Sequence, residues 1–157
     1  MEYQLIQIIN TSGILVLVAI TAYYAIQTKK IVKENQKSRH IQYLEKRLSY
    51  VYSPLLRLLE EAENEIIPGG GETDKKEMIF ISNDNLEEIN SIFKRYRYLM
   101  SKKLVDKLLK FIQIFNSLES YEGGGSLYDI DEINELNNIV SKEYNEIQES
   151  LNELIEI

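Results

Sequence analysis

Cysteine and tryptophan are absent from the 157-residue chain, and histidine occurs only once, as His40. Without cysteine, the chain has no disulfide framework, no thiolate nucleophile and no cysteine-based zinc site. One histidine cannot supply the two Glu-x-x-His motifs of a di-iron bundle, and no glycine-flanked serine lies near His40 to form a hydrolase triad. Because most of the usual catalytic groups are missing, we predict no enzymatic activity, no cofactor and no small-molecule substrate.

Acidic residues are abundant, but their spacing does not fit a metal site. The acidic run that begins at Asp129 and ends at Glu135 lacks the glycine that a calcium-binding loop requires. The run fits better as the N-cap and acidic first turn of a helix. Acid–base chemistry by carboxylates alone stays open, although Glu pairs in so acidic a chain are more typical of a solvated helix face. We therefore predict no metal site.

Charge is missing altogether from Tyr3 to Thr28. Within this stretch, Leu5–Ile26 has about the 20 mostly apolar residues that an α-helix needs to cross a membrane. We therefore predict that residues 1–28 form a single transmembrane anchor. Only Glu2 precedes the apolar run and lysines follow it, so the N-terminus is expected outside and residues 29–157 in the cytoplasm. A cleaved signal peptide is the less favoured alternative, because its basic flank would lie on the other side.

One stripe of the predicted anchor is polar. At 100° per residue, Gln7, Asn10, Thr11, Thr21 and Thr28 fall within about 100° of one another. Such a stripe is typical of membrane helices that contact a partner helix through hydrogen bonds and close packing. The first four of these residues are therefore candidate membrane-helix contacts. The equally weighted alternative is that the two amides only hydrate among the outer headgroups.

A basic segment follows the anchor. Residues 29–47 hold seven basic and two acidic side chains, a balance of +5, whereas residues 48–157 hold eleven basic and twenty-two acidic ones, a balance of −11. The acidic body argues against nucleic acid as a partner. The basic segment 29–47 sets the topology, and five of its side chains are also candidate contacts for anionic lipid headgroups: Lys29, Lys30, Lys33, Lys37 and Arg39.

The next helix is predicted at about residues 41–66, with an a/d seam over about three heptads. Pro54 lies within it and predicts a kink or a fresh helix start near Tyr52. The loop that follows contains Pro68 and three glycines. The seam consists of Ile41, Leu44, Leu48, Val51, Leu55, Leu58 and Ala62.

Three more helices are predicted, at about residues 84–100, 102–119 and 128–156. Asn83 or Asp84 is expected to cap the first of them, and Ser101 to cap the second after a tight turn, although one long helix through Ser101 also fits the apolar phase. The short apolar run Met78–Ile81 is expected to lead into a helix, since it has no evident pairing strand. Between Lys94 and Lys110 there are seven basic residues and one acidic residue.

The last predicted helix is acidic, with nine acidic residues and one lysine between Leu127 and Ile157. The favoured interpretation is that it packs beside the basic hairpin of the same domain. The alternative is that the basic hairpin faces an acidic partner or the membrane.

Two stretches, LEKRLSYVYSPLLRLLEE from Leu44 and YRYLMSKKLVDKLL from Tyr96, carry a resemblance. They resemble a loose group of uncharacterised prokaryotic single-pass membrane proteins with a cytoplasmic helical bundle. The resemblance implies an architecture and no activity.

The predicted fold is all-α: one N-terminal transmembrane helix that continues into a cytoplasmic antiparallel bundle of about four helices. Its predicted domains are the anchor 1–28, the basic juxtamembrane helix 29–47 and the acidic bundle 48–157. The predicted function is a non-catalytic interaction or scaffold protein at the cell membrane. Its expected partners are lipid and either a second copy or another membrane protein. The alternative is a small membrane-perturbing effector, such as a holin-like lysis or defence protein.

Overall fold

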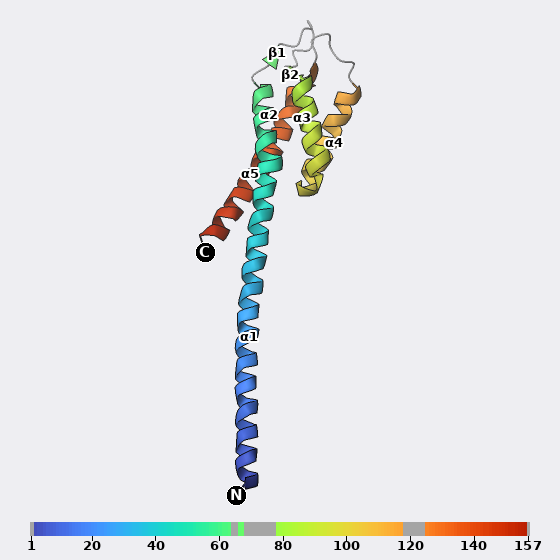
Figure 1. Cartoon of the computed structure of the whole chain (residues 1–157). Coiled ribbons are helices and arrows are strands. Elements are labelled where there is room, and N and C mark those ends of the chain that lie inside the picture. The colour runs from blue at the N-terminus through green and yellow to red at the C-terminus, as the bar shows by residue number, and fades with distance from the viewer. Residues whose placement is uncertain (1, 64–65, 68–77, 118–124, 157) are drawn as a thin grey trace. The chain divides into compact units, whose positions relative to one another are not determined.

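The computed structural model describes residues 2–63, 66–67, 78–117 and 125–156, which are mostly helical. The chain divides into two compact units, Met1–Ile41 and Gln42–Ile157, so the boundary falls inside the predicted juxtamembrane helix. In chain order the elements are α1 (Glu2–Arg47), η1 (Leu48–Tyr52), α2 (Ser53–Glu63), β1 (Ile66–Ile67), β2 (Met78–Ser82), α3 (Asn83–Tyr96), η2 (Arg97–Leu99), α4 (Lys102–Ser117), β3 (Gly125–Asp129) and α5 (Ile130–Ile155) (Figure 1).

The apolar N-terminal stretch is helical, as predicted. Its large side chains are exposed on every side of α1; for example, Leu15 is 65% exposed and Leu17 64%. The described chain contains one helical stretch that is long and apolar enough to cross a membrane, and none of its apolar window is buried. In this respect α1 differs from the core helix of a soluble protein, which would be mostly buried.

Pro54 changes the helix type without ending the helix. The five residues of η1 form a π-helical turn, in which the backbone N–H of Ser53 donates to the carbonyl of Leu48, five residues back. An α-helical proline would lack its own hydrogen bond and would clash with the carbonyl of Tyr50. Because a π turn is wider than an α turn, it displaces that carbonyl and lets the helix continue into α2.

A small antiparallel sheet corrects the all-α prediction. Strand β2 lies between β1 and β3, and its register places Ile79 opposite Tyr128 and Phe80 opposite Leu127. The run from Met78 leads directly into α3, as predicted, but it does so as a strand with a pairing partner. Its burial alternates along the strand, since Ile79 and Ile81 are buried while their neighbours are half-buried. The pairing strand β3 occupies the start of the last predicted helix, which begins only at Ile130.

Polar caps set the helix starts. The hydroxyl of Ser82 accepts a bond from the backbone N–H of Asn85 at 3.3 Å, so Ser82 caps α3 in place of the predicted Asn83 or Asp84. The hydroxyl of Ser101 accepts from the N–H of Leu104 at 3.0 Å, which confirms the predicted break there. Asp129 caps α5 as predicted, through a bond from the backbone of Asp131 at 3.1 Å.

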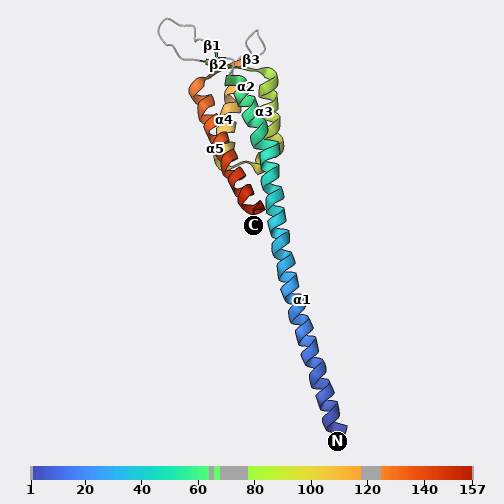
Figure 2. The ribbon, with the colours of Figure 1, turned by 90° about the vertical axis from the view of Figure 1, so that its left-hand side faces the viewer.

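One hydrophobic core joins α2, α3, α4, α5 and the sheet in the second unit. Every predicted seam residue from Leu44 to Ala62 is buried and Ile41 is half-buried. The buried stripe is wider than predicted, because Tyr52 and Leu59 are also fully buried. Figures 1 and 2 show the strands at one end of this unit and the turn between α3 and α4 at the other. The predicted loop with Pro68 lies outside the described residues. So does the C-terminal end of the helix predicted at 102–119, which includes Leu118.

Candidate functional site

A chain of polar side chains runs between the helices of the second unit. The guanidinium of Arg47 donates from Nε to the carbonyl of Leu99 at 2.8 Å and from Nη2 to the hydroxyl of Tyr52 at 2.8 Å. The Tyr52 hydroxyl donates to Oε2 of Glu143 at 2.6 Å. The other carboxylate oxygen, Oε1, accepts from the hydroxyl of Ser101, also at 2.6 Å. These five residues, called the Arg47–Glu143 network below, connect three segments that lie far apart in the sequence.

Electrostatics and ring contacts reinforce the same network. The guanidinium carbon of Arg47 lies 5.3 Å from the ring centroid of Tyr52 and 5.9 Å from that of Tyr43, so the cation sits between two aromatic faces. Burial, together with the hydrogen bond to Glu143, raises the pKa of Tyr52 to about 12. The phenol therefore stays protonated and keeps donating to Glu143 throughout the physiological pH range.

The polar groups of the Arg47–Glu143 network are hydrogen-bonded to one another. Both oxygens of the Glu143 carboxylate accept strong bonds, and the Arg47 guanidinium is shared between a carbonyl and a phenol. A general acid or nucleophile would need a polar atom directed at a substrate instead. The arrangement is therefore suited to holding η1, the α3–α4 turn and α5 in one register.

Tyr128 presents a contrasting case. Its ring is 1% exposed and stacks on Phe111 with centroids 4.5 Å apart. Its hydroxyl is buried and has no hydrogen-bond partner within the described part of the chain. Burial raises the pKa of Tyr128 above that of a free phenol, with a smaller contribution from the charge of Glu132.

The predicted membrane-helix contacts all lie on α1. The side chains of Gln7, Asn10 and Thr11 are outside the described ones. Thr21 is exposed, and its hydroxyl donates to the carbonyl of Leu17 in its own helix at 2.8 Å. A partner helix would therefore meet Thr21 mainly through close packing. A shallow groove of about 430 Å³ runs along this face, lined by Ile14, Leu17, Val18, Thr21, Ala22 and Ala25.

The predicted lipid contacts also lie along α1. Lys37 is half-buried and the other four are exposed. Lys30 approaches Glu34 one turn later at 4.0 Å, which partly offsets its charge. The structure thus leaves these cations available to solvent or headgroups. His40 is exposed.

The predicted packing of the acidic helix beside the basic hairpin is visible between α4 and α5. Lys107 of α4 is ion-paired with Glu135 of α5. The bond from Lys107 holds the pKa of Glu135 below its usual value, and Lys103 and Lys110 add to this effect. On the other side of the domain, Arg57 bridges Glu61 at 2.9 Å and Glu88 at 2.8 Å, joining α2 to α3.

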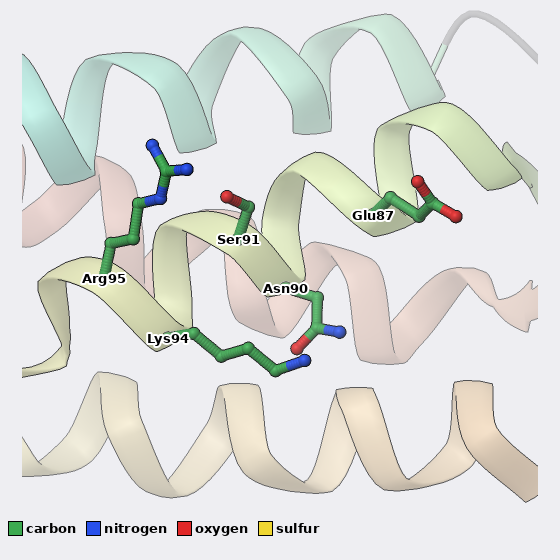
Figure 3. Close-up of a pocket in the computed structure, with 5 residues that line it drawn as sticks. All are labelled: Glu87, Asn90, Ser91, Lys94 and Arg95. Carbon is green, nitrogen blue, oxygen red and sulfur yellow. The ribbon is translucent and has the colours of Figure 1, made fainter.

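A polar hollow of about 430 Å³ lies on the outer face of α3 (Figure 3). It is wide open to solvent, and Figure 3 shows the side chains of Lys94 and Arg95 extending to opposite sides of the helix. The hollow offers charged groups on a surface and no enclosed reaction chamber. It is lined by Glu87, Asn90, Ser91, Lys94 and Arg95.

Sequence reasoning missed the Arg47–Glu143 network, although one signal was present. Along α5, Leu136, Val140 and Ile147 are buried, and Glu143 completes their stripe, three residues after Val140 and four before Ile147. A carboxylate on an apolar helix stripe requires partners, because burying it alone is costly.

Among the residues that the structure describes, no group of three or more Asp, Glu, His or Cys side chains could hold a metal ion. No protein-family model, curated protein or solved structure matches the chain. The resemblance to prokaryotic membrane-anchored proteins stays a prediction.

Proposed function

We propose that the protein is a membrane-tethered helical interaction or scaffold protein without catalytic activity. It lies in the cell membrane as a single-pass protein, with its N-terminus outside and an antiparallel bundle of helices in the cytoplasm. There it associates with further copies or serves as an accessory subunit of a membrane assembly. The proposal rests on one observation above all, which is the exposure of large apolar side chains all around α1.

That exposure is energetically expensive in water. Each fully buried Leu, Ile or Val side chain gains about 1.5–3 kcal/mol relative to an exposed one. Of the large apolar side chains between Ile14 and Ile26, none is less than 47% exposed. A lipid environment removes this cost, and among the described residues none of the apolar window is buried. The lysines Lys29, Lys33 and Lys37 share one face of the same helix, within about 100°, and would meet the headgroups.

The second unit supports a role in binding and not in catalysis. Its buried polar side chains, from Arg47 to Glu143, are hydrogen-bonded to one another in a way that fixes helix register.

On α1, the groove along Leu17, Thr21 and Ala25 includes small side chains on which a second helix could approach closely.

Topology can be tested directly because the chain contains no cysteine. A single cysteine placed at Glu2 should react with a membrane-impermeant maleimide in intact cells. A cysteine placed at exposed Asn145 should react only after permeabilisation. Labelling in the opposite pattern would reverse the orientation, and release of the protein by alkaline carbonate would overturn the membrane span.

Association is tested by light scattering of the full chain in detergent, coupled to size-exclusion chromatography. We expect more than one copy per particle. Ala25→Leu fills the groove and should shift the population toward monomers, whereas Ala19→Leu, on another face of α1, is the matched control and should not. A strictly monomeric wild type that recovers no partner from membranes would sink the proposal. Leakage of dye from vesicles at low protein density would favour a membrane-perturbing effector instead.

A further inference from the structure

Four cations gather at the turn between α3 and α4. These residues, called the basic turn, are Lys94, Arg95, Arg97 and Lys102. All four are exposed, and within the described residues none of them forms an ion pair with a carboxylate. Arg97 lies over the ring of Phe93 at 5.5 Å, and the side chain of Tyr98 beside it is 73% exposed. The basic turn therefore combines unneutralised positive charge with an exposed aromatic ring.

The C-terminal half of α5 has the opposite character. Glu146, Glu149, Glu153 and Glu156, called the acidic end, are all exposed. Glu146 lies 3.8 Å from Lys142, and among the described ion pairs the other three have no basic partner. Ile155 is 62% exposed at the same place. The acidic end thus has the charge opposite to that of the basic turn and also carries an exposed apolar side chain.

These two surfaces do not neutralise each other within one chain. The N-terminal half of α5 is matched to α4 through Lys107 and Glu135, but the remaining charges stay apart. Figure 1 shows the C-terminal half of α5 and the α3–α4 turn clearly separated at the same end of the second unit. The hydrogen bond between Ser101 and Glu143 explains why the α3–α4 turn and the C-terminal half of α5 lie at the same end, since it places the turn beside the middle of α5.

We infer that the basic turn of one copy binds the acidic end of a second copy of this chain. The inference rests on the proposed function, because anchoring in one membrane gives the copies a common orientation and a high effective concentration. Opposite charges that meet across an interface select the partner and set its register. Tyr98 and Ile155 supply an apolar contact at its centre. A second copy fits better than nucleic acid or an anionic lipid surface, because it presents both the carboxylates and the exposed apolar Ile155 that the basic turn and Tyr98 would contact.

The arrangement has a consequence for symmetry. A contact between the basic turn of one copy and the acidic end of another repeats in one of two ways. If each copy contacts two different neighbours, the contacts are heterologous and generate rings when the rotation closes and open rows when it does not. If two copies contact each other reciprocally about a two-fold axis, both pairs of surfaces are used at once and a dimer results.

The experiment is a charge-swap series on the full chain in zwitterionic vesicles. Association is measured by energy transfer between two dyes attached at Gln113→Cys, an exposed position on α4. One reversed variant, Arg95→Glu with Lys102→Glu, reverses two of the four charges of the basic turn and leaves it without net charge. The other, Glu149→Lys with Glu153→Lys, does the same to the acidic end. Two control pairs change the net charge equally at exposed sites elsewhere: Lys46→Glu with Lys110→Glu, and Glu45→Lys with Asp84→Lys.

Each reversed variant alone should associate at least about 10-fold more weakly than wild type, because one of the two facing surfaces then has no net charge and repels at the two swapped positions. An equal mixture of the two should recover association to near the wild-type value, since the unchanged basic turn of one variant then meets the unchanged acidic end of the other. The controls should behave as wild type, and circular dichroism should show unchanged helix content in all variants.

Other outcomes overturn the inference. If the reversed variants associate as wild type does while Ala25→Leu does not, the copies contact each other through α1. The proposed self-association is then supported and this interface is contradicted. If the mixture fails to recover, the two surfaces do not meet each other. If association requires anionic lipid, the basic turn binds headgroups instead. A wild type that never associates removes both this interface and the proposed self-association.

Discussion

Two buried tyrosines offer a controlled comparison of what a phenol hydroxyl contributes. Tyr52 is 0% exposed and Tyr128 is 1% exposed, so a change to phenylalanine removes the same atom from an equally buried site. The surroundings of the two atoms differ. The Tyr52 hydroxyl bonds Arg47 and Glu143, whereas the Tyr128 hydroxyl has no partner in the part of the chain that is described.

The expected effects follow from these partners. Hydrogen bonds to charged groups contribute about 1.5–3 kcal/mol each, and the Tyr52 hydroxyl makes two. Arg47 keeps its bond to Leu99 and Glu143 keeps its bond to Ser101, so part of that energy survives. We expect Tyr52→Phe to lower the free energy of unfolding by about 2–4 kcal/mol, which corresponds to roughly 10 °C in Tm for a domain of this size.

Tyr128→Phe should instead be neutral or stabilising by up to about 1 kcal/mol, since it removes a buried polar atom that lacks compensation. The ring keeps its stacking on Phe111. Urea and thermal unfolding of the full chain in detergent, followed by circular dichroism at 222 nm, measure both variants under one condition. A loss in Tyr128→Phe as large as that in Tyr52→Phe would refute the reasoning from hydrogen-bond partners.

Further outcomes are expected at high pH and at two other sites. The pKa of Tyr52 is about 12 in the folded chain and about 10 when unfolded. Its contribution to the free energy of unfolding is therefore complete below pH 10 and falls as pH rises toward 12. Unfolding measured against pH should show a smaller loss of stability over this range in Tyr52→Phe, and the smallest loss when Tyr128 is also replaced. Lys107→Met should return the pKa of Glu135 toward its ordinary value, as read by carboxyl ¹³C NMR against pH. Ser101→Ala removes both a helix cap and a bond to a carboxylate and should cost about 2 kcal/mol in urea unfolding, whereas Ser101→Thr should keep most of it.

The regular parts of the fold could be predicted from the sequence. The period of apolar residues identified the seam from Leu44 to Ala62, and it did so because each seam side chain is buried by helices on either side. The break at Ser101 was also predictable, since a serine hydroxyl competes with helix continuation by capping the next turn. Both cases depend on local chemistry or on one helix face.

The sheet and the polar network could not be predicted in the same way, because each depends on residues far apart in the sequence. The run from Met78 has a clear strand pattern only once its partner at Tyr128 is known. Tyr52 lies outside an a/d seam and is buried because α2 and η1 pack against several elements at once, which requires a wider stripe. Which hydroxyl groups would meet Glu143 depended on the packing of α5 against η1 and the α3–α4 turn.

The network also explains how a bundle with such regular apolar stripes could be restricted to one arrangement. Leucine and isoleucine stripes on α5 would pack almost as well after a shift by one heptad, since the apolar pattern repeats. Glu143 breaks that equivalence. In the observed register its carboxylate accepts hydrogen bonds from the hydroxyls of Tyr52 and Ser101, and Arg47 donates to the Tyr52 hydroxyl. After a shift of seven residues the same carboxylate would face apolar side chains without those donors, at a cost of several kcal/mol. A buried carboxylate with its hydrogen-bond donors adds little net stability compared with apolar side chains at the same positions. Its main effect is therefore to select the register that aligns the α3–α4 turn with α5.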